Sequence, residues 1–162
     1  MTIDYSKFTN KSRNAILTAV SLTKQCQYAA VEPQVMMVAL LQEGNDMVPF
    51  LLNQMHVEKN SFFTAVSNSM RNLEHAHIID PDFSSSLQQV LQESITIAQQ
   101  DSTNVVALEY IFGAFAKVNN PIKDIMSQFG ITQAKVVHAV NVFRLVGLNE
   151  DGQDWYPYVI VD

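Results

Sequence analysis

The chain has 162 residues, of which 48% are hydrophobic and 16% are charged, and its formal net charge is −6. This length suits one domain of ordinary size, and the composition supplies a hydrophobic core without a disulfide or a structural metal ion. The ten Lys and Arg residues are scattered, which excludes a basic stripe for nucleic-acid phosphates, and the sequence has no apolar run of about 18 residues to span a membrane.

The first residues, MTIDYSKF, are polar and lack the apolar core of an export signal. The single cysteine, Cys26, cannot form an internal disulfide, which fits a reducing compartment. We therefore expect a cytoplasmic protein. Because Cys26 falls at the end of an apolar helical stripe, we expect a small buried side chain there rather than a nucleophile.

Four helices are predicted in the first half of the chain. The first runs from about Asn10 to Gln27 behind Thr9, whose hydroxyl is suited to accept a hydrogen bond from a free amide of the first turn. Apolar and small side chains recur along it every three or four residues, at Ala15, Ile16, Ala19, Val20, Thr23 and Cys26. Pro33 suits the first turn of the second helix, VMMVALL, and Gly44 with Asn45 ends it.

A short third helix is predicted from Met47 to Met55, and a fourth from about Glu58 to Leu73. The fourth helix is expected to turn one apolar face toward the core, made of Phe62, Ala65, Val66 and Met70. The connector EHAHIIDPD is polar and contains Pro81, so we expect a loop between two units rather than a domain linker.

Four further helices follow in the same order. Ser84 is expected to cap a helix whose apolar face carries Leu87, Val90, Leu91, Ile95 and Ala98. The next helix is ALEYIFGAFA, a short one is PIKDIMSQF, and the last is TQAKVVHAVNVFRLV. The final segment, GLNEDGQDWYPYVIVD, breaks the pattern, and Pro157 blocks a helix there.

The two halves of the chain are copies of one unit. Phe8 and Phe83 open similar segments, and the same offset of 75 residues pairs Val31 with Val106 without a gap. After the second helix of the unit the offset becomes 74, and many matched pairs are apolar in both copies. A duplicated core keeps this pattern while its surface changes.

We therefore predict an all-α fold of eight helices, made of two tandem four-helix repeats that share one core with pseudo-twofold symmetry. The repeats cover about 8–73 and 83–145 within a domain at 1–145, and 146–162 is an irregular C-terminal tail. Four apolar side chains of the tail are expected to pack on an apolar surface of this chain or of a partner: Trp155, Tyr156, Tyr158 and Ile160.

Two segments at the spacing of the repeats carry a family resemblance, namely FTNKSRNAILTAVSLTKQCQYAAVEPQVMMVALLQEGN and FSSSLQQVLQESITIAQQDSTNVVALEYIFGAFA. Over about residues 5–143 the chain resembles the N-terminal Clp repeat domain of ClpB/ClpC-type ATPase chaperones, and ClpB in particular. The resemblance implies a non-catalytic eight-helix domain on a ring-forming ATPase. Such a domain binds exposed apolar segments of unfolded or aggregated clients, or adaptor proteins, and hands clients to the ring pore.

The resemblance also implies binding residues. Thr9 matches a helix-opening threonine that is implicated in client binding, and a plain N-cap also explains it. Glu109 matches a glutamate at the start of the second repeat's apolar helix; alternatively, it is a solvated first-turn carboxylate favoured by the helix dipole. Thr103 stands where ClpB-like domains have an aspartate, which weakens this polar rim.

ClpC-like domains have phosphoarginine pockets that pair a threonine with a glutamate in each repeat. On this pattern the first pocket pairs Thr9 with Gln34, so its carboxylate is lost, and the second pairs Ser84 with Glu109. A strong phosphoarginine reader is therefore not expected.

The family's apolar groove involves residues near the loop before that helix, and the local candidates are Val105, Val106, Leu108 and Tyr110. Val106 is better explained as core, since Val31 mirrors it in the first repeat. Leu108 is better explained as an exposed contact, because the family usually has a small polar residue there. Such a groove holds an extended or helical apolar segment by surface burial, with weak and broad affinity.

No catalysis is predicted for this chain itself. It lacks the glycine-rich turn followed by Lys-Ser/Thr that holds nucleotide phosphates, and nothing in the sequence brings a nucleophile and a base together. His75 and His77 form an H-x-H pair near Glu74 and Asp80, but the sequence fixes no third ligand. We therefore expect neither a metal site nor a cofactor.

Three functions remain open. The first is the client-recognition domain of a ClpB-like disaggregase, and the second is a stand-alone adaptor or regulator that docks on a Clp ATPase ring. The third is the N-domain of the Clp ATPase that recycles contractile secretion sheaths, which grips a helix of the sheath protein. The WYPYVIVD segment differs from the polar linker usual in ClpB-like proteins, which adds weight to the second, while the first remains our main hypothesis.

Overall fold

The computed structural model describes residues 3–44 and 46–147. Within these ranges the chain forms eight α-helices, two short 3-10 turns and no strand, which confirms the predicted all-α fold. The elements in chain order are η1 (Tyr5–Lys7), α1 (Asn10–Cys26), α2 (Pro33–Glu43), α3 (Met47–Gln54), α4 (Lys59–Ser69), η2 (Met70–Asn72), α5 (Ser85–Gln100), α6 (Leu108–Lys117), α7 (Pro121–Gln128) and α8 (Gln133–Leu145).

The helices begin where their capping residues predict. Thr9 Oγ1 accepts a hydrogen bond from the Ser12 N–H at 3.2 Å, and Ser84 Oγ accepts one from the Leu87 N–H at 3.2 Å. Pro33 occupies the first turn of α2. Each capping hydroxyl satisfies one of the amides that a helix leaves free at its N-terminus. Local sequence signals therefore set where these three helices begin.

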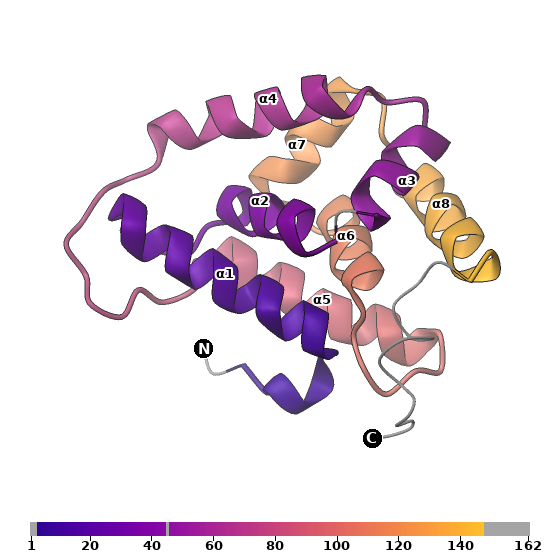
Figure 1. Ribbon diagram of the computed structural model, residues 1–162, viewed down its shortest axis with the longest axis horizontal. Coiled ribbons are helices and arrows are strands. Elements are labelled where there is room, and N and C mark those ends of the chain that lie inside the picture. The colour runs from indigo at the N-terminus through magenta and orange to yellow at the C-terminus, as the bar shows by residue number, and fades with distance from the viewer. Residues whose placement is uncertain (1–2, 45, 148–162) are drawn as a thin grey trace.

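The two repeats pack as copies of one another. In each repeat the first helix packs on the second, α1 on α2 and α5 on α6, and the fourth also packs on the second, α4 on α2 and α8 on α6. The short third helices reach across, so that α3 lies against α8 and α7 lies against α4. Figure 1 shows α2 and α6 in the middle of the molecule with the other helices around them. This arrangement is the predicted pair of four-helix repeats with pseudo-twofold symmetry.

Backbone hydrogen bonds join the repeats at two equivalent places. The Thr9 N–H donates to the Val106 carbonyl at 3.0 Å, and the Ser84 N–H donates to the Val31 carbonyl at 3.0 Å. The two valines donate back to the segments that precede the caps, at 2.7 Å and 2.9 Å. Each contact is a single parallel bridge. The segment entering the first helix of one repeat is thus fixed to the segment entering the second helix of the other.

Helices α2 and α6 form the centre of the core. Eight of the ten residues of α6 are buried, and Met36 and Met37 of α2 are fully buried, as their mid-helix positions predict.

In the described ranges no single helix is both long and apolar enough to cross a membrane. Helices α2 and α3, which are bent by 104° at their junction, meet that test as a pair by length and composition.

The connector between the repeats is fixed to the turn between α1 and α2. The Ala76 N–H donates to the Gln27 carbonyl at 2.9 Å, and the rings of His75 and Tyr28 lie 5.1 Å apart. In the part of the chain that the structure describes, no three His, Cys, Asp or Glu side chains are grouped as they would be around a metal ion.

Two expectations concern the ends of α1 and α8, namely the burial of Cys26 and the tail after α8. Cys26 is exposed, so its predicted burial is wrong. It is the last residue of α1, and the next residue, Gln27, adopts a left-handed conformation with φ of 57° that ends the helix. The tail predicted at 146–162 lies outside the described residues from 148 onward, and with it the four apolar side chains expected to pack.

Asn120 caps α7 from a buried position. Its Oδ1 accepts hydrogen bonds from the N–H groups of Ile122 and Lys123 at 2.9 Å and 3.2 Å, and its Nδ2 donates to the carbonyls of Phe115 and Val118 at 3.0 Å and 2.7 Å. Because Asn120→Ala leaves these groups without partners, we expect it to lower the free energy of unfolding by about 2–3 kcal/mol. Urea denaturation followed by far-ultraviolet circular dichroism measures this loss.

The neighbouring Asn119 is exposed and provides the control. Asn119→Ala is expected to change the free energy of unfolding by less than about 0.5 kcal/mol. Equal losses in the two variants would show that the cap does not stabilise α7 as its hydrogen bonds indicate.

Candidate functional site

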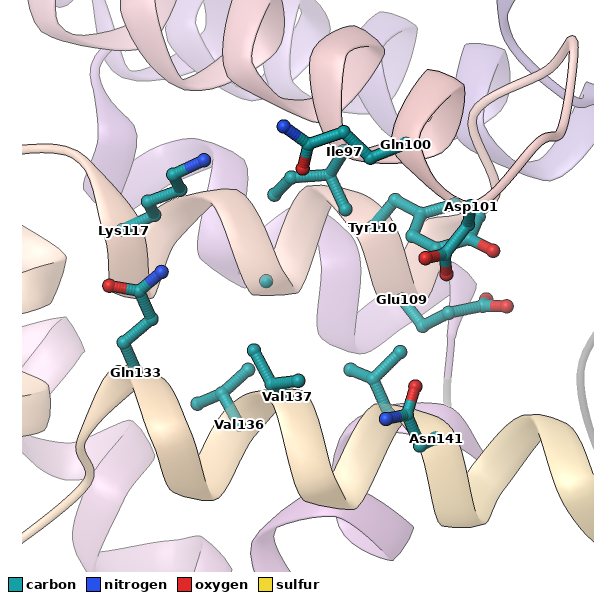
Figure 2. A pocket seen from close by; sticks show the side chains of 12 residues that line it. Ile97, Gln100, Asp101, Glu109, Tyr110, Lys117, Gln133, Val136, Val137 and Asn141 are labelled. Atoms are coloured by element: carbon teal, nitrogen blue, oxygen red, sulfur yellow. The ribbon is translucent and has the colours of Figure 1, made fainter.

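A pocket of about 150 Å3 opens in the second repeat, between the C-terminal end of α5, one side of α6 and α8. Figure 2 shows the side chains of these three helices pointing toward a common space. Aliphatic groups and one glycine form much of its lining: Ile97, Gly113, Val136, Val137 and Val140. The pocket is therefore suited to an apolar group.

Gly113 lies on the side of α6 that faces the pocket. Gly113 and Lys117 are the two residues of α6 that are not buried, and Glu109, Gly113 and Lys117 form one stripe at four-residue spacing. A Cβ added at Gly113 would meet a single heavy atom within 4 Å, the Cδ1 of Ile97 at 3.9 Å. The missing side chain therefore adds to the depth of the pocket.

The first repeat has larger side chains at the equivalent positions. Gly113 corresponds to Val38 by the offset of 75 residues, and Val136 corresponds by the offset of 74 to Phe62, which is fully buried. A depression of about 470 Å3 beside Val38 has a different lining, which includes Tyr28, Ser67, Met70, Arg71 and His75. The equivalent place in the first repeat therefore lacks this aliphatic lining.

An ion pair borders the pocket at the N-terminal end of α6. Arg144 Nη1 in the last turn of α8 donates to Glu109 Oε2, and the Glu109 side chain is 1% exposed. The alternative of a solvated carboxylate at Glu109 is therefore wrong. A carboxylate this buried is costly unless it is paired, and the Arg144 guanidinium offsets part of that cost.

The same guanidinium lies over the ring of Tyr110, with 4.9 Å between Arg144 Cζ and the ring centroid. This cation–π contact ties Arg144 to a second residue of α6. Burial raises the pKa of Tyr110, the Arg144 charge opposes the increase, and the Asp101 and Glu109 carboxylates add to it. The phenol therefore stays protonated at neutral pH, with its hydroxyl beside Asp101 in Figure 2 and no aligned hydrogen bond in the described residues.

The charged side chains of α6 that border the pocket are both paired within the fold. Lys117 Nζ lies 2.7 Å from Glu93 Oε2 on α5, although this contact lacks the alignment of a hydrogen bond. Glu109 is paired with Arg144. With these charges paired, the pocket presents aliphatic surface together with polar groups of Gln100 and Asp101 at the end of α5 and of Gln133 and Asn141 on α8.

The predicted groove residues divide into two groups. Glu109 and Tyr110 line the pocket, whereas Leu108 is 2% exposed, so its prediction as an exposed contact is wrong. Leu108 is the first residue of α6 and faces the first repeat, where a Cβ added to Gly44 would lie 3.2 Å from its Cδ1. Val105 is partly exposed, and its carbonyl accepts a hydrogen bond from the Thr103 hydroxyl at 2.6 Å. Val106, in contrast, is core as predicted.

Each capping residue lies beside the other repeat, whereas the phosphoarginine pattern pairs it with a residue of its own repeat. Thr9 is fixed beside the segment entering α6, which carries Glu109, and Ser84 is fixed beside the segment entering α2, which carries Gln34. The length of α1, about 26 Å, separates Thr9 from the turn into α2. The predicted pairings within each repeat are therefore wrong. Gln34 is buried, and its Oε1 has no hydrogen-bond partner in the described residues.

Sequence reasoning missed the residues that shape the pocket. A signal for Gly113 was present, because a glycine inside an apolar helix costs about 0.5–1 kcal/mol relative to alanine and the first repeat has Val38 there. No comparable signal marks Arg144, which is 35 residues from its partner Glu109. Pairing over that separation depends on how α8 packs.

Loss of the Arg144 charge is expected to remove the ion pair that offsets the cost of burying the Glu109 carboxylate. We expect Arg144→Met to lower the free energy of unfolding by about 3 kcal/mol, as measured by urea denaturation. The double variant Glu109→Gln/Arg144→Met reproduces the residues at the equivalent positions of the first repeat, Gln34 and Met70. It is expected to recover most of the loss. A single variant as stable as the original chain, or a double variant no more stable than the single, contradicts this account of the ion pair.

Comparison with known proteins agrees with the architecture. The family model described as the Clp repeat (R) N-terminal domain matches residues 7–129. The chain is 28% identical over 142 residues to the chaperone protein ClpB of Porphyromonas gingivalis, and 22% identical over 142 residues to ClpB of Bacteroides thetaiotaomicron. Each match covers 88% of this chain, but the chain spans only 16% of the length of these relatives.

Solved structures share the fold. The N-terminal domain of Hsp104 from Candida albicans matches with a TM-score of 0.74 and 22% identity, over 87% of this chain and 92% of that one. A ClpV N-domain in complex with a VipB peptide matches with a TM-score of 0.67 and 19% identity, over 84% of this chain and 88% of that one. The duplicated helices and the family match support one conclusion: this chain belongs to the Clp repeat N-terminal domain family.

Proposed function

We propose that this domain is the non-catalytic client- or adaptor-binding N-terminal domain of a ClpB-like protein unfoldase. In this proposal the pocket between α5, α6 and α8 receives an apolar side chain of the bound segment. The observation that carries the proposal is Gly113, which opens aliphatic surface on a helix that is otherwise almost fully buried. The ClpB chaperones among its relatives give the function its class.

The size of the pocket fits a weak and reversible interaction. An aromatic side chain buries about 150–250 Å2, which at about 25 cal/mol per Å2 corresponds to roughly 4–6 kcal/mol before ordering costs. Those costs consume much of this gain. Weak affinity suits a recognition domain that must release its clients.

The proposed contact residues follow from their positions. Glu109 and Tyr110 form part of the pocket wall, and the partly exposed Val105 extends the surface toward the loop before α6. Thr9 and Ser84 act chiefly as helix caps that position the entrances to α6 and α2, and Leu108 supports the pocket from the core.

The proposal assigns no cofactor, nucleic acid or membrane to this domain and places it in the cytoplasm. The ATPase that unfolds clients belongs to another domain or to a partner ring. The relatives are much longer than this chain, which leaves room for such a domain in them.

A second candidate function comes from the solved structures. One structural neighbour is a ClpV N-domain bound to a VipB peptide. By analogy, the pocket grips a helix of a secretion-sheath protein rather than varied unfolded clients. A third candidate is a stand-alone adaptor or regulator that docks on a Clp ATPase. Comparing capture of a sheath-protein peptide, an unfolded model client and a Clp ATPase ring separates the three.

Filling the pocket from α6 tests the proposed function. Gly113→Val places the side chain of the first repeat at this position, and the helix tolerates it because valine has a higher helix propensity than glycine. We expect about tenfold weaker binding of a fluorescein-labelled unfolded apolar peptide, equivalent to about 1.4 kcal/mol. Fluorescence anisotropy titration measures the affinity.

Ala134→Val is the matched control, because Ala134 is an exposed residue of α8 that does not line the pocket. This variant is expected to bind the peptide as the original chain does. Peptide binding that Gly113→Val leaves unchanged rules out the pocket as the client site.

A further inference from the structure

One face of α8 leads from the end of the helix to the pocket. Val137, Asn141 and Leu145 follow at four-residue spacing and therefore lie on one side of α8. Val137 and Asn141 line the pocket, and the two apolar members are well exposed, Val137 at 51% and Leu145 at 84%. A partly apolar track thus connects the C-terminal end of α8 with the pocket.

The sequence that follows α8 has a composition suited to this track. Residues 148–162 lie outside the described residues, and they include six aromatic or β-branched side chains, Trp155, Tyr156, Tyr158, Val159, Ile160 and Val161. The eight residue steps from Gly147 to Trp155 span at most about 26–29 Å, whereas α8 is only about 20 Å long. Trp155 is therefore within reach of every part of the pocket.

We propose that Trp155 of this same chain occupies the pocket between α5, α6 and α8. An aliphatic cavity of about 150 Å3 accommodates a benzene ring, and the pocket here is open, which leaves room for the rest of the indole. Ile97, Val136 and Val140 supply aliphatic walls, and the side-chain carbonyl of Gln133 or Asn141 is suited to accept from the indole N–H.

The tail is then a built-in competitor for the client site. This consequence rests on the proposed function, whereas the occupancy by Trp155 does not. If Trp155 fills the pocket for about four fifths of the time, the apparent affinity for a client falls about fivefold. Clients whose apolar side chain fits the pocket displace the tail, and clients that bind the pocket more weakly do not.

Trp155 is the only tryptophan among the 162 residues, so its fluorescence reports on the pocket directly in this chain. We expect emission at shorter wavelength than in urea, and protection from acrylamide quenching, in the original chain and in Ala134→Val. In Gly113→Val we expect both features to shift toward the values of the unfolded chain. Circular dichroism verifies that all three proteins are folded.

Three results would overturn the proposal. Trp155 that is fully accessible to acrylamide in the original chain excludes occupancy, and protection that persists in Gly113→Val places the indole elsewhere. Protection that appears only as protein concentration rises shows that a second copy supplies the tryptophan.

A second measurement separates this inference from the proposed function. Trp155→Ser in the 162-residue chain is expected to raise the affinity for the labelled apolar peptide about fivefold. Equal affinities in the two proteins overturn the tail's role as a competitor and leave client binding intact. Protected Trp155 in a chain whose Trp155→Ser variant binds no peptide supports occupancy and rejects the proposed function.

Discussion

The fold depends on covering α2 and α6, two helices that are apolar on nearly every side. The first and fourth helices of a repeat cover part of its second helix, and the rest is covered by the other repeat. Helix α7 packs on α2, α3 packs on α6, and the two central helices touch each other. A single repeat would leave that remaining apolar surface in water, so the duplicated unit is stable only as a pair. The bridges beside Thr9 and Ser84 fix how the two copies meet.

Much of the fold was predictable because its signals are local. Thr9 and Ser84 cap helices within three residues of themselves, and Pro33 fixes a helix start by its own geometry. The offsets of 75 and 74 residues identify equivalent positions, but they do not say which equivalents lie together. Gln34 and Glu109 are equivalent positions, so the repeat alignment cannot tell beside which of them Thr9 lies. Only the packing across the pseudo-twofold axis decides between them, and it selects Glu109.

The candidate site was harder to predict because its properties come from helices distant in sequence. A first-turn carboxylate such as Glu109 is ordinarily solvated, and the ion pair with Arg144 at the end of α8 offsets the cost of its burial. Leu108 was predicted as an exposed contact, but it is buried because α6 packs against the first repeat. Tyr110 was predicted at the site, but the guanidinium over its ring was not. In each case the missing information was a contact between helices rather than a residue preference.

The pocket is preformed because both of its walls are fixed to α6. Space left by a small residue in a core tends to close when neighbouring helices can relax into it. Here Arg144 fixes the last turn of α8 to α6, and Lys117 of α6 is paired with Glu93 of α5, so both walls are attached to the helix that carries Gly113. The first repeat has Gln34 and Met70 in place of the ion pair, and it has Val38 and Phe62 where the second has Gly113 and Val136. The ion pair and the small side chains therefore occur in the same repeat, which follows if a preformed pocket needs both. A pocket formed in advance lowers the ordering cost of binding, and a weak, reversible interaction then suffices to retain an apolar side chain.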